Sequence, residues 1–316
     1  MFPRWTDIAI YTRYERLWDM EVKLVLNVLK KHRIIYAYLL GFLGVLCFAA
    51  TLPLTTIALN DFSPIFITVI RAVIAGVAAC VWVVFSSLSK PRRDEIKPLV
   101  VSGLGLVFGF PLAMGIGLQS VPSYHGAVVL GILPLVTAGL SVIVYGYRAR
   151  LGFWICAVVG TSLVIMFTLR EQDGSMSWAD LWLVSAALMA SFGYVIAGNL
   201  AKQRPGPWVI CWSLILLSPI SVMATVVVWP DFFWVRPDSS LMALLALGLF
   251  SMFFGFFAWN TGLALGGIAE VGQVQLLQLF LTLIWGSILI GEVVTIEVWV
   301  FAVLVATTVY FGRRFA

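Results

Sequence analysis

The stretch Leu99–Leu118 reads LVVSGLGLVFGFPLAMGIGL, contains no charged side chain and does not alternate polar with apolar positions. A helix of about 20 apolar residues crosses roughly 30 Å of hydrocarbon, whereas a strand of a membrane barrel would alternate. Similar runs recur along the 316 residues, of which 61% are hydrophobic and 11% charged, and the mean hydropathy is +1.02. The sequence therefore predicts an all-α integral membrane protein.

Charged residues, prolines and glycines divide the chain into a polar tail at residues 1–33 and ten predicted transmembrane helices. The predicted helices are residues 34–59, 63–88, 98–119, 123–145, 151–169, 179–201, 207–229, 240–264, 268–291 and 295–312. The tail lacks the apolar core and small-residue cleavage site of a secretory signal, and either Met1 or Met20 could be the true start.

The basic residues orient these helices. If the N-terminus is cytoplasmic, the tail and the cytoplasmic loops hold seventeen of the 20 lysines and arginines, while the outside loops hold Arg170 and Arg236 and one span holds Arg71. The positive-inside rule then predicts an inner-membrane protein with both termini in the cytoplasm. This topology accounts for the net charge of +5, so we expect membrane lipids as partners and no nucleic acid.

Motifs for enzymatic chemistry are absent from the sequence. The four cysteines lie in apolar runs, where a thiol behaves as a small hydrophobic group. The chain has no HExxH, no Gly-x-Ser-x-Gly and no GxxxxGK[ST] phosphate loop. We therefore expect no enzyme, no metal site, no cofactor and no ATP-driven transport by this chain alone.

The fourth and ninth predicted helices share a polar start, a long apolar run and a glycine exit. Alignment of Gly146 with Gly291 gives an offset of 145 residues between two candidate repeats, residues 34–169 and 179–312. Because each repeat has five helices, the second would be inverted relative to the first. Transporters built in this way bind substrate near the middle of the membrane, between the repeats.

Three stretches resemble the EamA family of the drug/metabolite transporter superfamily. They are FSPIFITVIRAVIAG at Phe62–Gly76, ADLWLVSAALMASFGYVIAGNLAK at Ala179–Lys202 and FFAWNTGLALGGIAEVGQVQLLQLFLTLIWGSILIGE at Phe256–Glu292. The first has the family's proline followed by an arginine, and the third ends in its Gly-Glu pair. The resemblance covers most of residues 34–312, and it implies ten helices in two repeats and export of amino acids or related metabolites.

The sequence departs from the family pattern at two positions. Tyr147 stands where the first repeat usually has a glutamate, and Leu279 stands where a proline often interrupts the second repeat. Pro134 keeps the corresponding proline of the first repeat, and Pro111 predicts a further kink in the third helix. A break is thus expected in the fourth helix and not in the ninth.

Arg71 lies about eight residues into the second predicted helix, or roughly 12 Å deep at 1.5 Å per residue. A central arginine costs roughly 2.5 to 3.5 kcal/mol on a translocon scale, so the side chain should point into the bundle. Its guanidinium suits a substrate carboxylate or phosphate. A structural pairing with helix-terminal carbonyls or an acidic side chain is the alternative.

A polar stripe runs along the ninth predicted helix. At about 100° per residue, Gln273 lies about 60° to one side of Glu270 and Gln278 about 80° to the other. Unsatisfied amides are costly in hydrocarbon, so this face should contact other helices or a water-filled cavity. The density of polar residues favours a cavity over hydrogen bonding between helices alone.

Several further residues have two interpretations each. Glu270 either caps its helix or carries protons, and His125, its partner in the repeat alignment, either lies at the interface or titrates in the pathway. Proton coupling through this pair is a hypothesis. Trp259 and Asn260 either contact substrate or anchor their helix at the headgroups, and Tyr194 is a weaker pathway candidate.

These observations favour a secondary transporter that moves a small polar metabolite by alternating access. The resemblance implies an amino acid or related metabolite as the leading substrate and export as the direction, and Arg71 is consistent with a carboxylate. A drug or cation exporter is the alternative within transport, but the first predicted helix has no acidic residue. A channel-like conduit or a lipid-handling membrane protein is the alternative from another class.

Overall fold

The computed structural model describes residues 33–86, 88–146, 150–171, 177–201, 203–204, 207–231, 233–235, 237–266 and 271–315. Within these residues all regular structure is helical. The first helix covers Arg33–Leu59 and ends in α2 (Thr51–Leu59). It is followed by α3 (Pro64–Phe85), α4 (Arg93–Gly103), the π-helix η1 (Leu104–Gly109), α5 (Phe110–Gly117), α6 (Ser123–Leu130), α7 (Leu133–Tyr145) and α8 (Leu151–Glu171).

The second half of the chain continues in the same way. Its elements are α9 (Trp178–Ala201), α10 (Trp208–Val227), the short 3-10 helix η2 (Phe233–Val235), α11 (Asp238–Ala246), the π-helix η3 (Leu247–Phe254), α12 (Gly255–Gly266), the 3-10 helix η4 (Gly272–Leu276), α14 (Leu277–Ile290) and α15 (Ile296–Phe315).

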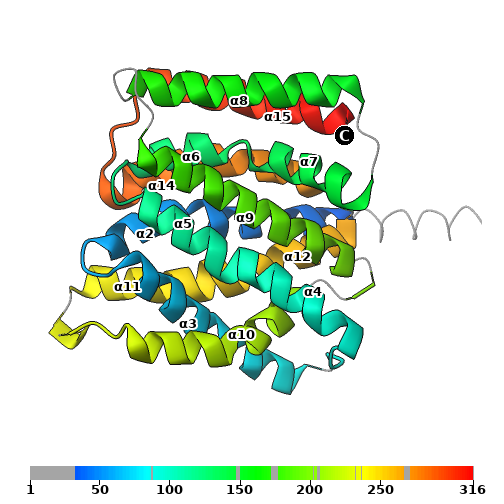
Figure 1. Cartoon of the computed structure of the whole chain (residues 1–316), viewed down its shortest axis with the longest axis vertical. Coiled ribbons are helices and arrows are strands. Elements are labelled where there is room, and N and C mark those ends of the chain that lie inside the picture. The colour runs from blue at the N-terminus through cyan, green and yellow to red at the C-terminus, as the bar shows by residue number, and fades with distance from the viewer. Residues whose placement is uncertain are drawn as a thin grey trace, which may run out of the picture.

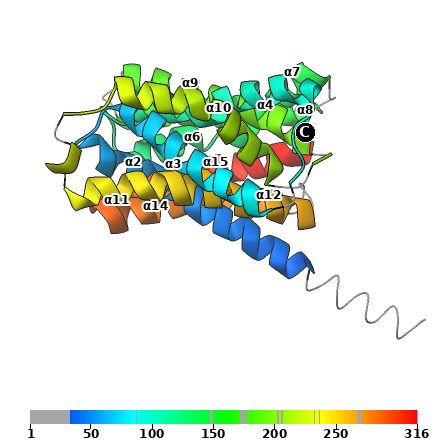
Figure 2. The ribbon, with the colours of Figure 1, turned by 90° about the horizontal axis from the view of Figure 1, so that it is seen from below.

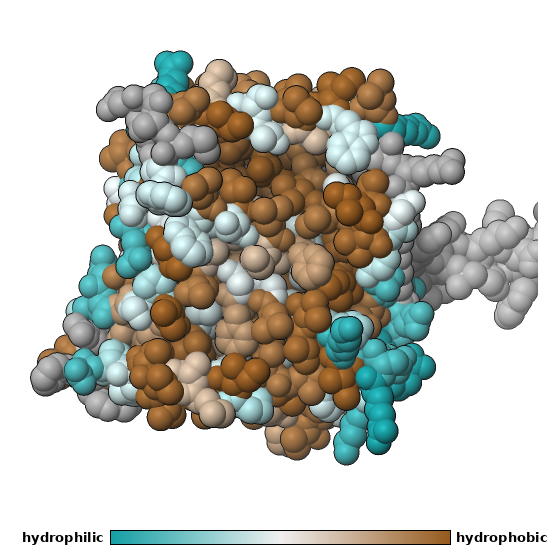
Figure 3. All heavy atoms as spheres, in the orientation of Figure 1, coloured by the Kyte–Doolittle hydropathy of each residue, from teal (hydrophilic) through white to brown (hydrophobic). Residues whose placement is uncertain are grey.

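Eight continuous helical segments of the described chain are long and apolar enough to cross a membrane, and two shorter apolar helices follow at Val274–Ile290 and Ile296–Gly312. Each overlaps one of the ten predicted helices. The protein is therefore an all-α membrane protein. In the space-filling view, apolar residues cover the middle of the visible face and hydrophilic residues gather at its two ends (Figure 3). Exposed side chains such as Val84, Val158 and Val226 face lipid in this arrangement.

The two ends of the helices differ. The described start of the first helix and the C-terminal end of α15 lie at the same end of the bundle (Figures 1 and 2). We call this the terminal end, and it also contains Arg150, whose backbone N–H donates to the carbonyl of Phe315. The opposite end, which contains the start of α6 and the end of α14, is called the far end. At one edge of the bundle α8 and α15 pack side by side (Figure 1).

Irregular segments recur at corresponding places in the two halves. A π-helix interrupts the third helix of each half, as η1 and η3. Gly146 and Gly291 end the fourth helices with left-handed φ angles of 68° and 69°. Two non-helical residues separate α6 from α7, just before Pro134, and the 3-10 helix η4 precedes α14.

The helix around Leu279 is unbroken, as the missing proline predicts, because α14 runs from Leu277 to Ile290; the irregular segment of the ninth helix is η4, which precedes it. Leu279 itself is buried in α14, after the irregular segment. In the third helix, Pro111 lies in the first turn of α5, which follows the π-helix η1.

Close backbone packing joins the halves at Gly105. A Cβ atom on this residue would lie 2.6 Å from the carbonyl oxygen of Met189 and 3.2 Å from Gly193 in α9. At Gly198, also in α9, an added Cβ atom would have nothing within 4 Å. Small residues at such contacts let membrane helices approach closely.

We predict that Gly105→Ala destabilises the protein by about 1–3 kcal/mol, because the added methyl group meets backbone that cannot rotate away. Gly198→Ala is the matched control and should have little effect on stability. Thermal unfolding of the purified protein in detergent, followed by tryptophan fluorescence, measures both. Equal melting temperatures for the two variants would contradict the close contact.

Candidate functional site

A central cavity lies between the two halves and consists of two adjoining compartments that share part of their lining. The compartment beside Arg71 has a volume of about 80 Å³, and the compartment on the terminal side has a volume of about 280 Å³. We call them the Arg71 compartment and the terminal compartment. Six residues line both: Leu106, Leu133, Pro134, Tyr194, Phe256 and Gln275. The irregular segments η1, η3 and η4 all contribute to the wall, where non-α backbone is tolerated in a membrane protein.

Arg71 is deeply buried in the wall of the smaller compartment, with 3% of its surface exposed. One terminal nitrogen, Nη2, donates to the hydroxyl of Ser251 at 3.0 Å. That hydroxyl also lies 2.7 Å from the hydroxyl of Thr51. Ser251 belongs to the π-helix η3 and Thr51 begins α2, so three helices meet at the guanidinium.

The remaining guanidinium nitrogens are not satisfied by this hydroxyl pair. Nε and Nη1 of Arg71 are buried and have no hydrogen-bond partner among the residues that the structure describes. Arg71 is also the single charged side chain among the described residues that line either compartment. A buried guanidinium with unused donors can receive an anion, and a planar carboxylate fits its geometry.

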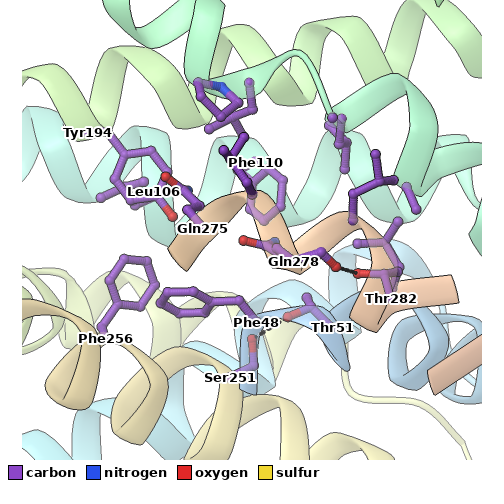
Figure 4. Close-up of a pocket in the computed structure, with 18 of the residues that line it drawn as sticks. Phe48, Thr51, Leu106, Phe110, Tyr194, Ser251, Phe256, Gln275, Gln278 and Thr282 are labelled. Carbon is purple, nitrogen blue, oxygen red and sulfur yellow. Dashed lines mark hydrogen bonds between the residues drawn. The ribbon is translucent and has the colours of Figure 1, made fainter. Parts of the chain in front are cut away.

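Two amide side chains extend the polar surface from Arg71 toward the terminal compartment. Gln278 projects into the space between Phe110 and Phe48, and Gln275 lies near Tyr194 (Figure 4). Neither amide side chain bonds to another group within the described part of the chain. In contrast, the hydroxyl of Thr282 donates a hydrogen bond to the backbone carbonyl of Gln278 at 2.8 Å. The amides are therefore available to a bound molecule.

The terminal compartment combines aromatic and amide groups. Tyr194, Trp259 and Asn260 all line it, as the sequence suggested for pathway residues. Trp259 is buried and packs edge-on to Phe48, with ring centroids 6.5 Å apart. The compartment reaches Ala264, an exposed residue near the end of α12.

His125 lies outside the cavity wall. Its Nε2 atom is 2.7 Å from Oδ1 of Asp180, and both side chains are 1% exposed. The other carboxylate oxygen of Asp180 accepts hydrogen bonds from the backbone N–H and the hydroxyl of Ser177, and the imidazole packs against Phe167. The pair joins α6 to the first turn of α9, which gives His125 a structural partner in the other half.

Two predicted polar residues cannot be placed in this site. Glu270 lies outside the described residues, and for Gln273 the structure describes the backbone in η4 but not the side chain. Sequence reasoning overlooked Thr51, Ser251 and Phe256, because single hydroxyls and phenylalanines are common in membrane helices and give no signal of their own. Within the described residues no group of three or more His, Cys, Asp or Glu side chains could hold a metal ion.

Comparisons with known proteins agree on the type of protein. A sequence model of the EamA-like transporter family matches residues 35–169 and 177–312. The chain is 40% identical over 278 residues to the Bacillus subtilis protein named "Uncharacterized transporter YdeK", covering 87% of this chain and 96% of the relative. It is 25% identical over 177 residues to the "S-adenosylmethionine/S-adenosylhomocysteine transporter" of Chlamydia muridarum, covering 53% of this chain and 55% of that protein.

A solved crystal structure has the same fold. It superposes with a TM-score of 0.62 at 19% sequence identity and covers 87% of this chain and 95% of its own. At this identity the likeness concerns the arrangement of the helices alone.

We predict that His125→Ala and Asp180→Ala each lower the free energy of unfolding by about 3–5 kcal/mol, because each leaves a buried polar partner without its counterpart. The double variant should cost clearly less than the sum of the two. Tyr124→Phe, which removes an exposed hydrogen bond to Glu171, is the control. Additive losses in melting experiments would show that the two side chains do not act as a pair.

Proposed function

Because the chain belongs to the EamA-like transporter family, we propose that it carries a small carboxylate-bearing metabolite across the membrane by alternating access, with an amino acid or a related compound as the leading substrate. The protein is a transporter and not an enzyme. The single observation that supports the substrate class is the guanidinium of Arg71, which is buried at the cavity with Nε and Nη1 unpartnered among the described residues.

The carboxylate of the substrate would lie against Arg71 and Ser251 in the smaller compartment. Gln278 would contact the polar groups next to the carboxylate, and the remainder of the molecule would extend past Tyr194 into the larger compartment. An anion in this position supplies the acceptor that the two free guanidinium nitrogens lack. The absence of a described acidic side chain from the wall argues against a cationic drug as the main substrate.

Ten membrane-spanning helices in two inverted repeats are the second part of the proposal. Three features that occur once in each half support a repeated unit. They are a π-helix in the third helix, a left-handed glycine at the end of the fourth helix, and an irregular segment within the fourth helix. Both described ends of the chain lie on one side of the bundle, as an even number of crossings requires. Movement of the two repeats about the central cavity would expose it to each side in turn.

The orientation follows from the charges. We infer that the terminal end lies on the cytoplasmic side of the inner membrane. The tail and the loops that the ten-helix topology assigns to this side contain most of the lysines and arginines, and the positive-inside rule places such segments in the cytoplasm. The terminal compartment reaches exposed Ala264 at that end, so substrate would enter from the cytoplasm and leave at the far end. Export is therefore the proposed direction.

The transport proposal is tested with purified protein in liposomes. A panel of amino acids should include S-adenosylmethionine and S-adenosylhomocysteine, because one relative is named for them and both molecules carry an amino-acid carboxylate. Saturable counterflow by at least one carboxylate in the panel is the expected result. Flux that never saturates and shows no counterflow would instead indicate a channel-like conduit.

We predict that Arg71→Gln lowers the affinity for the transported carboxylate by at least about 30-fold, because removing a buried charged partner costs about 2–5 kcal/mol. Arg71→Lys should retain part of the binding, since it keeps the charge but loses the planar donor pair. Arg170→Gln, at the exposed end of α8, is the matched control for loss of one arginine.

The measurement is the concentration dependence of counterflow in liposomes, together with the melting temperature of each variant. Unchanged half-saturation in a folded Arg71→Gln protein would contradict the assignment of Arg71 to the substrate site.

A further inference from the structure

The carboxylate of Glu292 is bound by the first turn of α6 at the far end. One oxygen, Oε1, accepts the backbone N–H of Ser123 at 2.6 Å. The other, Oε2, accepts the hydroxyl of Ser123 at 2.6 Å and the backbone N–H of Tyr124 at 3.3 Å. Glu292 follows α14 in the second half of the chain, whereas α6 belongs to the first half, so these three hydrogen bonds join the halves.

The local backbone is adapted to this contact. Gly291 ends α14 with a left-handed φ of 69°, and directly after it the backbone N–H of Glu292 donates to the carbonyl of Gly286. Gly286 leaves room for the carboxylate, because a Cβ atom there would lie 2.6 Å from Oε2 of Glu292 and 3.0 Å from the hydroxyl of Ser123. Two glycines therefore allow one glutamate to reach the neighbouring helix.

The contact lies between the substrate cavity and the far end. Ala127 and Thr282 line the cavity, on α6 and α14 respectively. Ser123 is one helical turn beyond Ala127, and Glu292 is ten residues beyond Thr282, both in the direction of the far end. Two of the helices that line the cavity are thus joined to each other on its far side, and an opening of the far end between α6 and α14 would have to break this contact.

In the repeat alignment, the sequence has no corresponding carboxylate at the equivalent position of the first half. Gly146 corresponds to Gly291, and both end their helices in the left-handed conformation. The residue after Gly146 is Tyr147, which has no carboxylate, whereas the residue after Gly291 is Glu292. A carboxylate at this position of the repeat can therefore hold the far end and not the terminal end.

We propose that Glu292 is a conformational latch that holds the far end closed and biases the empty carrier toward the state open at the terminal end. The inference rests on the proposed alternating access but not on the identity of the substrate. Separation of α6 from α14 breaks charge-assisted hydrogen bonds and exposes the start of α6, where a negative charge is favoured. Each opening of the far end must break this contact.

The test uses a cysteine introduced by Thr282→Cys, in a protein whose Cys47, Cys80, Cys156 and Cys211 are replaced by alanine. A membrane-impermeant maleimide is added from each side in vesicles of both orientations, without substrate. With Glu292 intact, labelling from the terminal side should exceed labelling from the far side. Glu292→Gln should raise the ratio of far-side to terminal-side labelling about tenfold, the effect expected when one charge-assisted hydrogen bond is lost.

A steric variant tests the same contact independently. Gly286→Ala should also raise the labelling ratio, because the added methyl group pushes against the carboxylate of Glu292. In a protein that already carries Glu292→Ala, the further substitution Gly286→Ala should change the ratio little. Glu297→Gln is the matched control, since it removes an acid at the same end that pairs with Arg170.

The possible results separate a latch from a merely structural role. A ratio that stays constant in Glu292→Gln, or labelling that rises equally from both sides, would overturn the proposal. A ratio raised equally by Glu297→Gln would overturn it as well. Because labelling is measured without substrate, a failed carboxylate assay with wild-type protein leaves this result unaffected, and the two proposals fail separately.

Discussion

The guanidinium of Arg71 sets a requirement that its surroundings must meet, because a charged group in hydrocarbon costs several kcal/mol unless other groups replace its hydration. The described residues meet that requirement in part. Ser251 accepts one hydrogen bond and is itself tied to Thr51, but two guanidinium nitrogens remain unused. An arginine kept for structure would be expected to have an internal carboxylate or several carbonyls as partners. The two guanidinium nitrogens without a partner, Nε and Nη1, belong to a side chain that lines the cavity, and they instead fit a substrate anion that binds and dissociates.

The shape of the cavity depends on departures from regular helix. In lipid, irregular backbone is tolerated where protein or a cavity covers it, and the π-helices η1 and η3 and the 3-10 helix η4 all lie at the cavity wall. The π-helix η3 presents Ser251 to Arg71, and η4 presents Gln275 beside Tyr194. Two polar groups of the cavity, the hydroxyl of Ser251 and the amide of Gln275, thus belong to irregular segments. The contact between Glu292 and α6 lies beyond them and governs access and not affinity.

The sequence was sufficient to predict the class of fold and several cavity residues. Long apolar runs revealed the helices, and the isolated polar residues Arg71, Tyr194, Asn260 and Gln278 stood out because hydrocarbon makes them costly. Each of these four lines the cavity. What the sequence could not provide was the register between helices that are distant along the chain. Arg71 and Ser251 are 180 residues apart, and the partners His125 and Asp180 are 55 apart. Local pattern does not determine which turn of one helix faces which turn of another. The irregular start of the ninth helix was missed for a related reason, because tertiary packing can impose a 3-10 turn without proline.

The central claim is that Arg71 binds the carboxylate of the substrate, and the most direct measurement compares an acid with its neutral amide. The binding constants of a transported amino acid and of the corresponding amino-acid amide are measured in wild-type protein and in Arg71→Gln. The account predicts that wild-type protein prefers the acid by about 30-fold or more and that Arg71→Gln loses this preference. A preference for the acid that is equally strong in both proteins would contradict it.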